Sequence, residues 1–281
     1  MIITIYSPKV QSIFFDCDNC LYVDNWKTAN LLMAKIDQYC MERYEVGLPS
    51  GQAYELYKQY GTCLKGLLAK GMILSPDSID EFLQAVHDIP LELQRNEALG
   101  SMLAAMDPSI PKYIFTASVA EHAERCLQQL GIAQHFPRSR IIDCKQCDLE
   151  TKHSAHALRA AMTIAGVTNP ECCMLLDDNV HNIYAVRMQG WRAVLVDTTG
   201  RDCGKPIASE HAELQIATIL DVRDQRAHGQ NRSRRHGTRN HEDMMEFLGP
   251  VFLHFRLESY AHHIDQTISL KNNDITFKKI L

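Results

Sequence analysis

Two carboxylates separated by one residue follow a short apolar run near the start of the chain. Ile13, Phe14 and Phe15 are the β-branched and aromatic residues typical of a buried strand. Asp16 and Asp18 come directly after them, and side chains two positions apart at a strand end project to the same side. Two adjacent carboxylates repel each other unless a cation neutralises them or one of them holds a proton. We therefore expect a chemical site at the carboxyl end of this strand.

Other apolar runs end in polar residues of complementary chemistry. Thr116 ends the strand-like run 112–116, and Asp177-Asp178 follows the buried run 172–176. If the first strand lies between the second and the fourth, these groups meet at one edge of a parallel sheet, where such folds bind ligands. Asp16 and Asp18 on their own would be compatible with solvated strand-end acids, and it is the second acid pair that favours a shared site.

The strands that position these groups alternate with helical patterns. Strand-like runs lie near residues 13–15, 112–116, 141–142, 172–176 and 193–196, and helices are predicted between the later ones. Ser118 and Glu121 form a capping-box pattern at the start of one of these helices. Alternation of this kind predicts βαβ units and a doubly wound parallel α/β sheet.

A helical block separates the first two strands. Roughly 95 residues lie between them, whereas a parallel crossover needs only about a dozen. Residues 24–106 contain four helical patterns, one of which begins after Ser50 and includes Gly61 and Gly66. We expect this block to fold over the acid pair as a lid. The predicted domains are a core of residues 1–23 and 107–222, a helical cap of residues 24–106 and a tail of residues 223–281.

The segment SIFFDCDNCLY, residues 12–22, resembles the first motif of the haloacid dehalogenase superfamily, the Asp-x-Asp phosphohydrolases. Its FFDCDNCLY part is similar to the pyrimidine 5′-nucleotidase branch, as are residues 57–61 and 65–67. The helical insertion occupies the C1 cap position of the superfamily. The resemblance covers about residues 12–200 and implies a Rossmannoid core with an inserted all-helical C1 cap.

The resemblance assigns a role to each polar strand end. Asp16 would attack phosphorus and form an aspartyl-phosphate, and Asp18 would protonate the leaving oxygen and then activate water. The hydroxyl and backbone amide of Thr116, with the neighbouring Ala117, would hold the phosphoryl oxygens. Lys152 would neutralise the nucleophile and the phosphate. Dehalogenases lack an acid at the position of Asp18, so its presence argues for phosphate chemistry.

The same resemblance implies a Mg²⁺ cofactor. Asp177 and Asp178, with Asp16 and the carbonyl of Asp18, would supply oxygen ligands to the ion. Asn182 fits an Asp-Asp-x-x-x-Asn-Ile pattern and would support an acid through a hydrogen bond, although a surface Asn would look the same.

Several positions depart from the pattern or leave their role open. Ala117 stands where the family often has Asn, and His153 follows Lys152 where Pro is common, which would affect substrate positioning or rate. Tyr60 and Lys65, in the helical block, are candidates for contacts to the leaving group.

Cysteine spacing and composition give weaker indications. Two Cys-x-x-Cys pairs, Cys17/Cys20 and Cys144/Cys147, lie too far apart in sequence for an ordinary zinc ribbon, so free thiols are expected. Ten cysteines with neither a signal-like leader nor a long apolar segment predict a reduced, cytoplasmic protein without a membrane span.

Charge divides unevenly between the body and the tail. Residues 223–281 carry ten basic and seven acidic side chains, so +3 of the net charge of −5 lies there and residues 1–222 carry −8. An acidic body argues against nucleic acid as the main partner. Residues 226–239, with five Arg and two His, read as a disordered linker.

We therefore predict a Mg²⁺-dependent phosphatase of a small phosphorylated metabolite, with a pyrimidine nucleoside 5′-monophosphate as the expected substrate. The alternatives are a phosphatase of another small metabolite or of a lysophospholipid, and a catalytically silent protein that binds a partner through its basic tail. The oligomeric state does not follow from the sequence.

Overall fold

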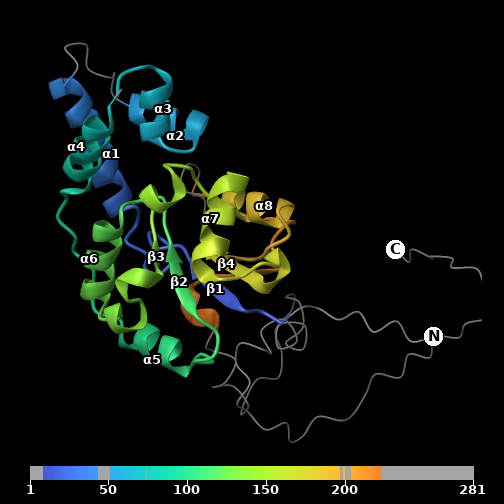
Figure 1. The fold of residues 1–281 in the computed structure, drawn as a ribbon. Coiled ribbons are helices and arrows are strands. Elements are labelled where there is room, and N and C mark those ends of the chain that lie inside the picture. Colours follow the sequence, from blue (N-terminus) through green and yellow to red (C-terminus); the bar gives the residue numbers. More distant parts are fainter. Residues whose placement is uncertain (1–8, 44–50, 74, 197–198, 200–203, 223–281) are drawn as a thin grey trace, which may run out of the picture.

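A six-stranded parallel sheet forms the centre of the molecule in the computed structural model, which describes residues 9–43, 51–73, 75–196, 199 and 204–222. The strand order is β3-β2-β1-β4-β5-β6, so β1 lies between β2 and β4 as expected (Figure 1). The strands are β1 Ser12–Phe15, β2 Lys112–Phe115, β3 Ile141–Ile142, β4 Cys173–Asp177, β5 Arg192–Val196 and β6 Leu214–Ile216. The prediction of a doubly wound parallel α/β fold is confirmed. The short β6 was not predicted, because three residues with a central Gln carry little strand signal.

Helices cover both faces of the sheet, and the side chains of β1 alternate between them. Phe15 packs in one apolar cluster with residues of α5 and α6, and Phe14 packs in the other with residues of α7 and α8. A parallel sheet covered on both faces requires apolar residues at successive strand positions, and each residue of β1 is buried. The helices are α5 Glu97–Ala105, α6 Ala120–Leu130, α7 Ala155–Ala165 and α8 Val180–Met188.

Helix α6 begins differently from the capping-box prediction. Its N-cap residue is Val119, whose side chain makes no capping hydrogen bond. The backbone N–H of Ala120 instead donates to Oδ2 of Asp143, from the loop after β3, at 3.1 Å. The free amides at the start of this helix were expected to donate to the side chains of Ser118 and Glu121. For Ala120, a carboxylate 23 residues away accepts the hydrogen bond.

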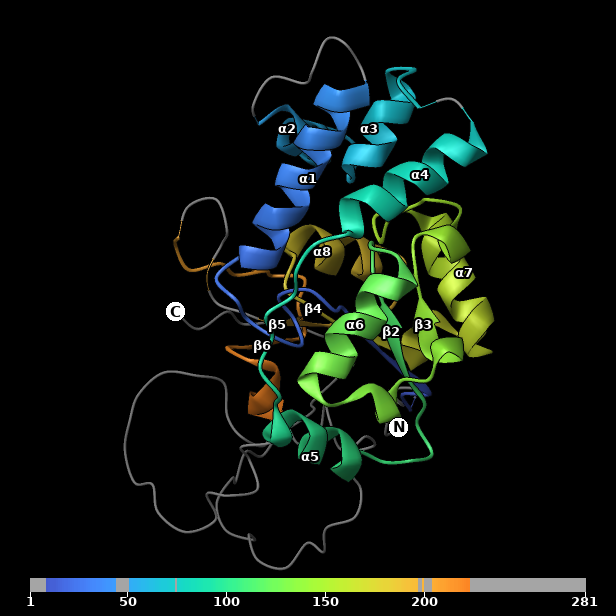
Figure 2. The ribbon, with the colours of Figure 1, turned by 90° about the vertical axis from the view of Figure 1, so that its left-hand side faces the viewer.

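Four helices form the cap at the carboxyl end of the sheet, and they share an apolar cluster that also includes Val119 and Cys144 of the core (Figure 2). They are α1 Lys27–Arg43, α2 Gln52–Tyr60, α3 Cys63–Ala69 and α4 Pro76–His87. The single helix expected to contain Gly61 and Gly66 is two helices, because Gly61 ends α2 in the left-handed conformation with φ 81°. The expected N-cap, Ser50, lies outside the described residues.

Helix α5 packs with the core of the sheet. Leu99, Met102 and Leu103 share an apolar cluster with Phe15 of β1. Although α5 lies within residues 24–106, which were expected to form the cap, it packs on the sheet. The domain boundaries stay a prediction.

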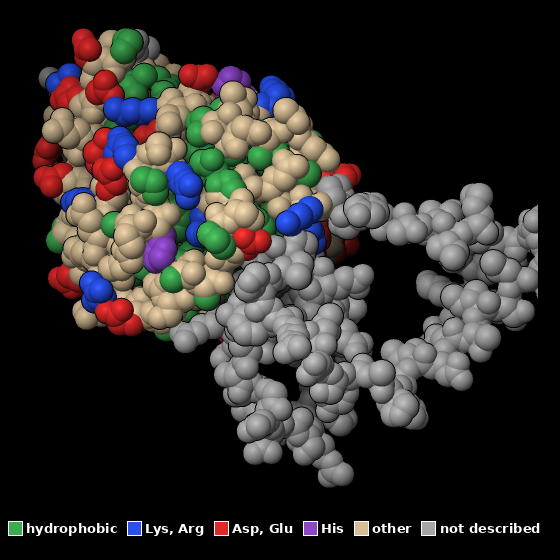
Figure 3. Space-filling model, turned by 60° about the horizontal axis from the view of Figure 1, so that its bottom comes forward, with side chains coloured by type: hydrophobic (Ala, Val, Ile, Leu, Met, Phe, Trp, Pro, Cys, Tyr) green, Lys and Arg blue, Asp and Glu red, His purple; other side chains and the backbone are tan. Residues whose placement is uncertain are grey.

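Short 3-10 helices complete the described elements, at Ala133–His135, Arg138–Arg140, Lys145–Cys147, Pro170–Cys172 and Ile219–Val222. On the face in Figure 3, side chains of both charge signs are interspersed between small apolar groups. Among the described residues, no helix combines the length and hydropathy that a bilayer crossing requires. The tail, with its basic run, lies outside the described part of the chain.

Candidate active site

The pairing of β1 with β4 brings the two acid pairs to the same edge of the sheet. Phe15 lies opposite Leu176, and the backbone N–H of Asp16 donates to the carbonyl of Leu176 at 2.9 Å. Asp16 and Asp177 therefore follow adjacent positions of neighbouring strands. Carboxylate oxygens of Asp16, Asp177 and Asp178 all lie within 4.8 Å of one another.

Lys152 lies between two of these acids. Its Nζ donates to Oδ1 of Asp16 at 2.5 Å and to Oδ2 of Asp177 at 2.7 Å, and its side chain is 3% exposed. The loop before α7 carries Lys152 to this position. Burial would lower the pKa of the ammonium, but the two carboxylates outweigh burial and raise it. Lys152 is therefore a permanent cation in the site.

One ammonium does not neutralise three carboxylates. Burial, opposed by Lys152 and reinforced by Asp177, raises the pKa of Asp16 to about 7. Burial and the nearby Asp177 also raise the pKa of Asp178 well above its ordinary value. An all-oxygen donor set with excess negative charge fits a hard divalent cation such as Mg²⁺.

Side chains at the start of α8 orient Asp177. Nδ2 of Asn182 donates to both carboxylate oxygens of Asp177, at 2.9 and 3.0 Å. The backbone N–H of Asn179 donates to Oδ1 of Asp177 at 2.9 Å. These three hydrogen bonds, from two nitrogen atoms, hold the carboxylate in one orientation, and Asn182 makes the supporting hydrogen bond that the sequence indicated.

The side chain of Asp18 has different partners. Its Oδ1 accepts from the hydroxyl of Tyr22 at 2.5 Å and lies 2.8 Å from Nε2 of His122, which is buried in α6. Burial would raise the pKa of Asp18, but His122 and the hydrogen bonds from His122 and Tyr22 outweigh it and lower the pKa to about 2. Asp18 is therefore a charged acceptor in this conformation.

Sequence reasoning missed His122 and Tyr22. Tyr22 lies four residues beyond Asp18, inside the recognised motif, yet nothing in its type indicates a polar role. His122 lies in the first turn of the helix after Thr116, and only its position on the inward face reveals it. A His on the buried side of an otherwise apolar helix face is the signal that could have found it.

Thr116 is buried at the end of β2, beside the acids. Its hydroxyl oxygen accepts from the backbone N–H of Ser118 at 3.1 Å, which leaves the hydroxyl proton available to a phosphoryl oxygen. Its backbone N–H donates to the carbonyl of Ile142 at 3.0 Å. The expected phosphate contact from this amide is therefore wrong, because the amide belongs to the sheet hydrogen bonds. Ala117 follows at an exposed position.

The cap approaches the loop that carries Lys152. Nζ of Lys65 donates to Oε2 of Glu150 at 2.7 Å, so in this conformation Lys65 joins the cap to the core. Nδ2 of Asn179 donates to the hydroxyl of Tyr57 at 3.2 Å, a second contact between cap and core. Tyr60, half-buried, packs against the apolar cluster of the cap.

This fold is the Rossmannoid α/β fold of haloacid dehalogenase-like proteins, with the polar residues at the carboxyl ends of β1, β2 and β4. No family model matches the chain. Three solved structures share the fold, at identities that carry no further inference. CbbY from Rhodobacter sphaeroides in complex with phosphate has a TM-score of 0.55 at 14% identity, covering 76% of this chain and 96% of CbbY.

A CbbY mutant in complex with xylulose-(1,5)bisphosphate gives a TM-score of 0.54 at 15% identity, over 76% of this chain and 96% of that one. A putative β-phosphoglucomutase from Bacteroides vulgatus gives 0.50 at 14% identity, over 76% and 86%. In sequence, the chain is similar to Phosphate metabolism protein 8 of Saccharomyces cerevisiae, 25% identical over 232 residues, covering 76% of this chain and 70% of the yeast protein. The structural similarities show a shared fold, and the sequence similarity extends over three quarters of the chain.

Proposed function

We propose that the protein is a Mg²⁺-dependent phosphatase that hydrolyses a small phosphate monoester through an aspartyl-phosphate. The observation that carries this proposal is the meeting of Asp16 with Lys152 and the acid pair Asp177-Asp178 at one sheet edge. A carboxylate nucleophile needs such a neighbourhood, because it must approach an anionic phosphate without repulsion.

The cation and the lysine would divide the neutralisation of charge. Asp16, Asp178 and the carbonyl of Asp18 are the expected ligands, together with Asp177, which Asn182 and Lys152 already hold in place. When bound, Mg²⁺ would supply positive charge to the phosphoryl oxygens. Lys152 would remain beside Asp16 and stabilise the negative charge that builds up in the transition state.

The covalent steps would be carried by two carboxyl groups. An oxygen of Asp16 attacks phosphorus, the bond to the leaving oxygen breaks, and that oxygen takes a proton from Asp18. Water then attacks the aspartyl-phosphate and gives a proton to Asp18, which restores both groups. Because Asp18 is an acceptor in this conformation, it must first take a proton, and Nε2 of His122 at 2.8 Å is a nearby donor. The Thr116 hydroxyl would hold a phosphoryl oxygen.

The proposed substrate class rests on the relatives and on the sequence resemblance. CbbY was crystallised with phosphate and with a sugar bisphosphate, and the yeast relative is named for phosphate metabolism, which supports a small phosphorylated metabolite. Within this class we propose a pyrimidine nucleoside 5′-monophosphate, on the resemblance of residues 12–22 to that branch. Another phosphorylated metabolite or a lysophospholipid is the alternative.

A panel of phosphate esters assayed with Mg²⁺ tests both the phosphatase activity and the preference for a pyrimidine nucleotide. We expect CMP and UMP to have the highest kcat/KM, and we expect Asp16→Asn to lower it on the order of 10⁴-fold, because the nucleophile is lost. Asp148→Asn is the matched control, since Asp148 is an exposed acid on a loop and lies at φ 53°, which Asn tolerates. It should retain activity.

The possible outcomes separate the alternatives. Activity on sugar phosphates or lysophospholipids without activity on CMP or UMP would keep the phosphatase and reject the nucleotide. If the protein hydrolyses no ester but binds RNA or another protein through its basic tail, the catalytically silent binding protein is favoured.

A further inference from the structure

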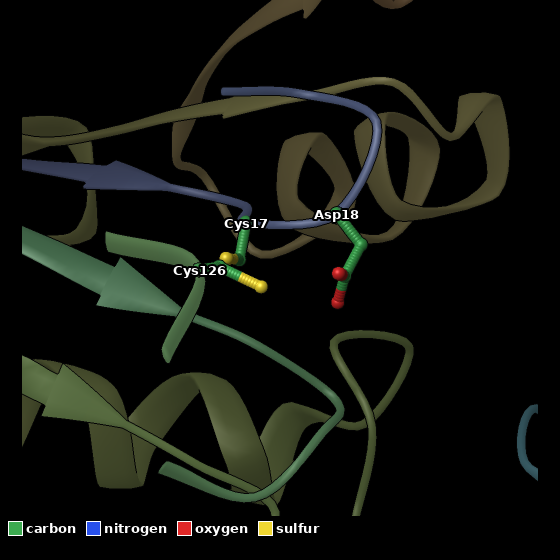
Figure 4. A group of neighbouring side chains, drawn as sticks. All are labelled: Cys17, Asp18 and Cys126. Atoms are coloured by element: carbon green, nitrogen blue, oxygen red, sulfur yellow. The ribbon is translucent and has the colours of Figure 1, made fainter. Parts of the chain in front are cut away.

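A second cluster of donor atoms lies beside the proposed active site and contains sulfur. The thiols of Cys17 and Cys126 and a carboxylate oxygen of Asp18 all lie within 4.8 Å of one another. Figure 4 shows the two sulfur atoms side by side, with the carboxylate of Asp18 extending from the next residue of the same loop. Cys17 comes from the end of β1 and Cys126 from α6, so only the fold brings them together.

His122 adds a nitrogen to this cluster. It lies four residues before Cys126, and therefore one turn away on the same face of α6. Its Nε2 is 3.6 Å from Sγ of Cys126 and 2.8 Å from Oδ1 of Asp18. Both cysteines are fully buried free thiols, His122 is 1% exposed, and the side chain of Asp18 is 22% exposed. An ion could thus reach the cluster from the side of Asp18.

One distance within the cluster already matches a tetrahedral ion. With a bond of about 2.3 Å to sulfur and about 2.1 Å to nitrogen, the sulfur–nitrogen edge of a tetrahedral zinc site is about 3.6 Å. The distance between Cys126 and His122 already has this value. Two thiolates, an imidazole and a carboxylate prefer Zn²⁺ to Mg²⁺, whereas the all-oxygen set of Asp16, Asp177 and Asp178 has the opposite preference.

We propose that Cys17, His122, Cys126 and the carboxylate of Asp18 form a binding site for a thiophilic divalent cation such as Zn²⁺. It would adjoin the magnesium site, to which Asp18 would contribute only its backbone carbonyl. On binding, each thiol releases its proton to solvent, and His122 also loses the proton on Nε2, because a ring nitrogen must be deprotonated to bind a metal. The hydrogen bonds from His122 and from the hydroxyl of Tyr22 to Asp18 are then broken. Two thiolates and one carboxylate then surround the dication. The sequence pairs Cys17 with Cys20 by spacing, but the fold pairs it with Cys126.

Occupation of this site would block hydrolysis, a consequence that rests on the proposed function. A carboxylate bound to a dication can neither hold the proton for the leaving oxygen nor take one from water. We therefore expect Zn²⁺ to inhibit the phosphatase in the presence of saturating Mg²⁺.

Cobalt titration of the full chain, kept reduced by a phosphine, tests the site without any activity. We expect one Co²⁺ to bind with a thiolate-to-cobalt charge-transfer band, to be displaced by Zn²⁺ and to be unaffected by excess Mg²⁺. Cys126→Ser and Cys17→Ser should each weaken this binding by more than the 10–100-fold, roughly, that loss of an outer-shell partner costs. Cys147→Ser, at a buried thiol outside the cluster, is the control and should bind as the wild type does.

A charge-transfer band that persists unchanged in both cluster variants, or that disappears in Cys147→Ser, would overturn the proposal. Should neither cluster variant fold, X-ray absorption of the zinc-loaded wild type decides: two sulfur neighbours support the site, and a shell without sulfur rejects it. Cobalt binding at the cluster in a protein without phosphatase activity would keep this site and reject the proposed function. Zinc inhibition that Cys126→Ser retains would reject the site as the cause of inhibition.

Discussion

The carboxylates of Asp16, Asp177 and Asp178 lie together at the carboxyl ends of β1 and β4. Lys152 reduces the repulsion between them, because its ammonium pairs with two of the three. The ammonium contacts Asp16 and Asp177 and is almost fully buried. Removing one partner of a buried ion pair leaves an uncompensated charge, which costs more than the pair itself contributes.

We expect Lys152→Met to lower the free energy of unfolding by about 3–5 kcal/mol in the absence of divalent ions. Mg²⁺ should recover part of this loss, because a cation replaces the missing charge. Urea unfolding with and without Mg²⁺ measures both effects. Lys112→Met removes a buried lysine at the amino end of β2 and is the control: Mg²⁺ should stabilise it by no more than it stabilises the wild type.

The pair between Asp18 and His122 gives the protein a defined pH dependence. Burial would lower the pKa of His122, but Asp18 outweighs it and raises the pKa from 6.5 to about 10. The raised pKa of His122 stabilises the folded protein fully below pH 6.5, and this stabilisation is lost as the pH rises toward 10. The lowered pKa of Asp18 stabilises the folded protein above pH 3.8, and this stabilisation is lost as the pH falls toward 2.

His122→Gln should therefore destabilise the protein most between pH 3.8 and pH 6.5. The difference from wild type should shrink on either side of this window. Denaturant unfolding over a pH series measures it. His156→Gln, which removes a more exposed partner of Asp148, should show a much smaller dependence. A constant difference across the whole range would contradict the assignment of charge to His122.

At the scale of elements, the close approach of α2 and α3 depends on a glycine. A Cβ at Gly66 would lie 2.8 Å from Cβ and 2.9 Å from Cδ2 of Leu56, shorter than real contacts. From the helical pattern alone, a glycine at this position is expected to destabilise the helix. Packing shows that it allows two short helices of the cap to touch.

Gly66→Ala should lower the free energy of unfolding, because overpacking costs about 1–3 kcal/mol, whereas the gain in helix propensity is at most about 1 kcal/mol. Gly100→Ala is the matched control in α5. The nearest atom to its Cβ would be Cγ2 of Ile132 at 3.8 Å, so it should be neutral or stabilising. The urea midpoint should fall for Gly66→Ala and should stay the same or rise for Gly100→Ala.

At the scale of the whole molecule, the described elements end at Val222 in a 3-10 helix. Ile219 packs in the same apolar cluster as Phe15 of β1, which ties this last element to the core. The acidic body and the basic segment beyond it carry −8 and +3 respectively. Charge of opposite sign in the two parts indicates separate roles.

A chain that ends at residue 222 should keep the urea midpoint and the phosphatase activity of the full chain. If the full chain binds RNA at low salt, the truncated chain should not, because it lacks the clustered Arg residues that would contact the phosphates. Urea unfolding, an ester assay and a filter-binding assay measure the three properties. Loss of the cooperative transition on truncation would show that the tail belongs to the fold.

The sequence by itself determined the strands that carry the acids and the parallel sheet they form. Runs such as Ile13–Phe15 are apolar at successive positions because both faces of the sheet are covered, and the acids follow because the chain must leave the core there. Lys152 and Asn182 were indicated only by the resemblance of the surrounding motifs to the haloacid dehalogenase superfamily.

Only the tertiary structure decided the partners of Asp18, the capping of α6 by Asp143 and the pairing of Cys17 with Cys126. Each of these contacts joins residues at least 23 positions apart, apart from that of Tyr22. Local patterns report which face of an element is apolar. They do not report which polar side chain of a distant element faces it, because that depends on how the helices pack on the sheet.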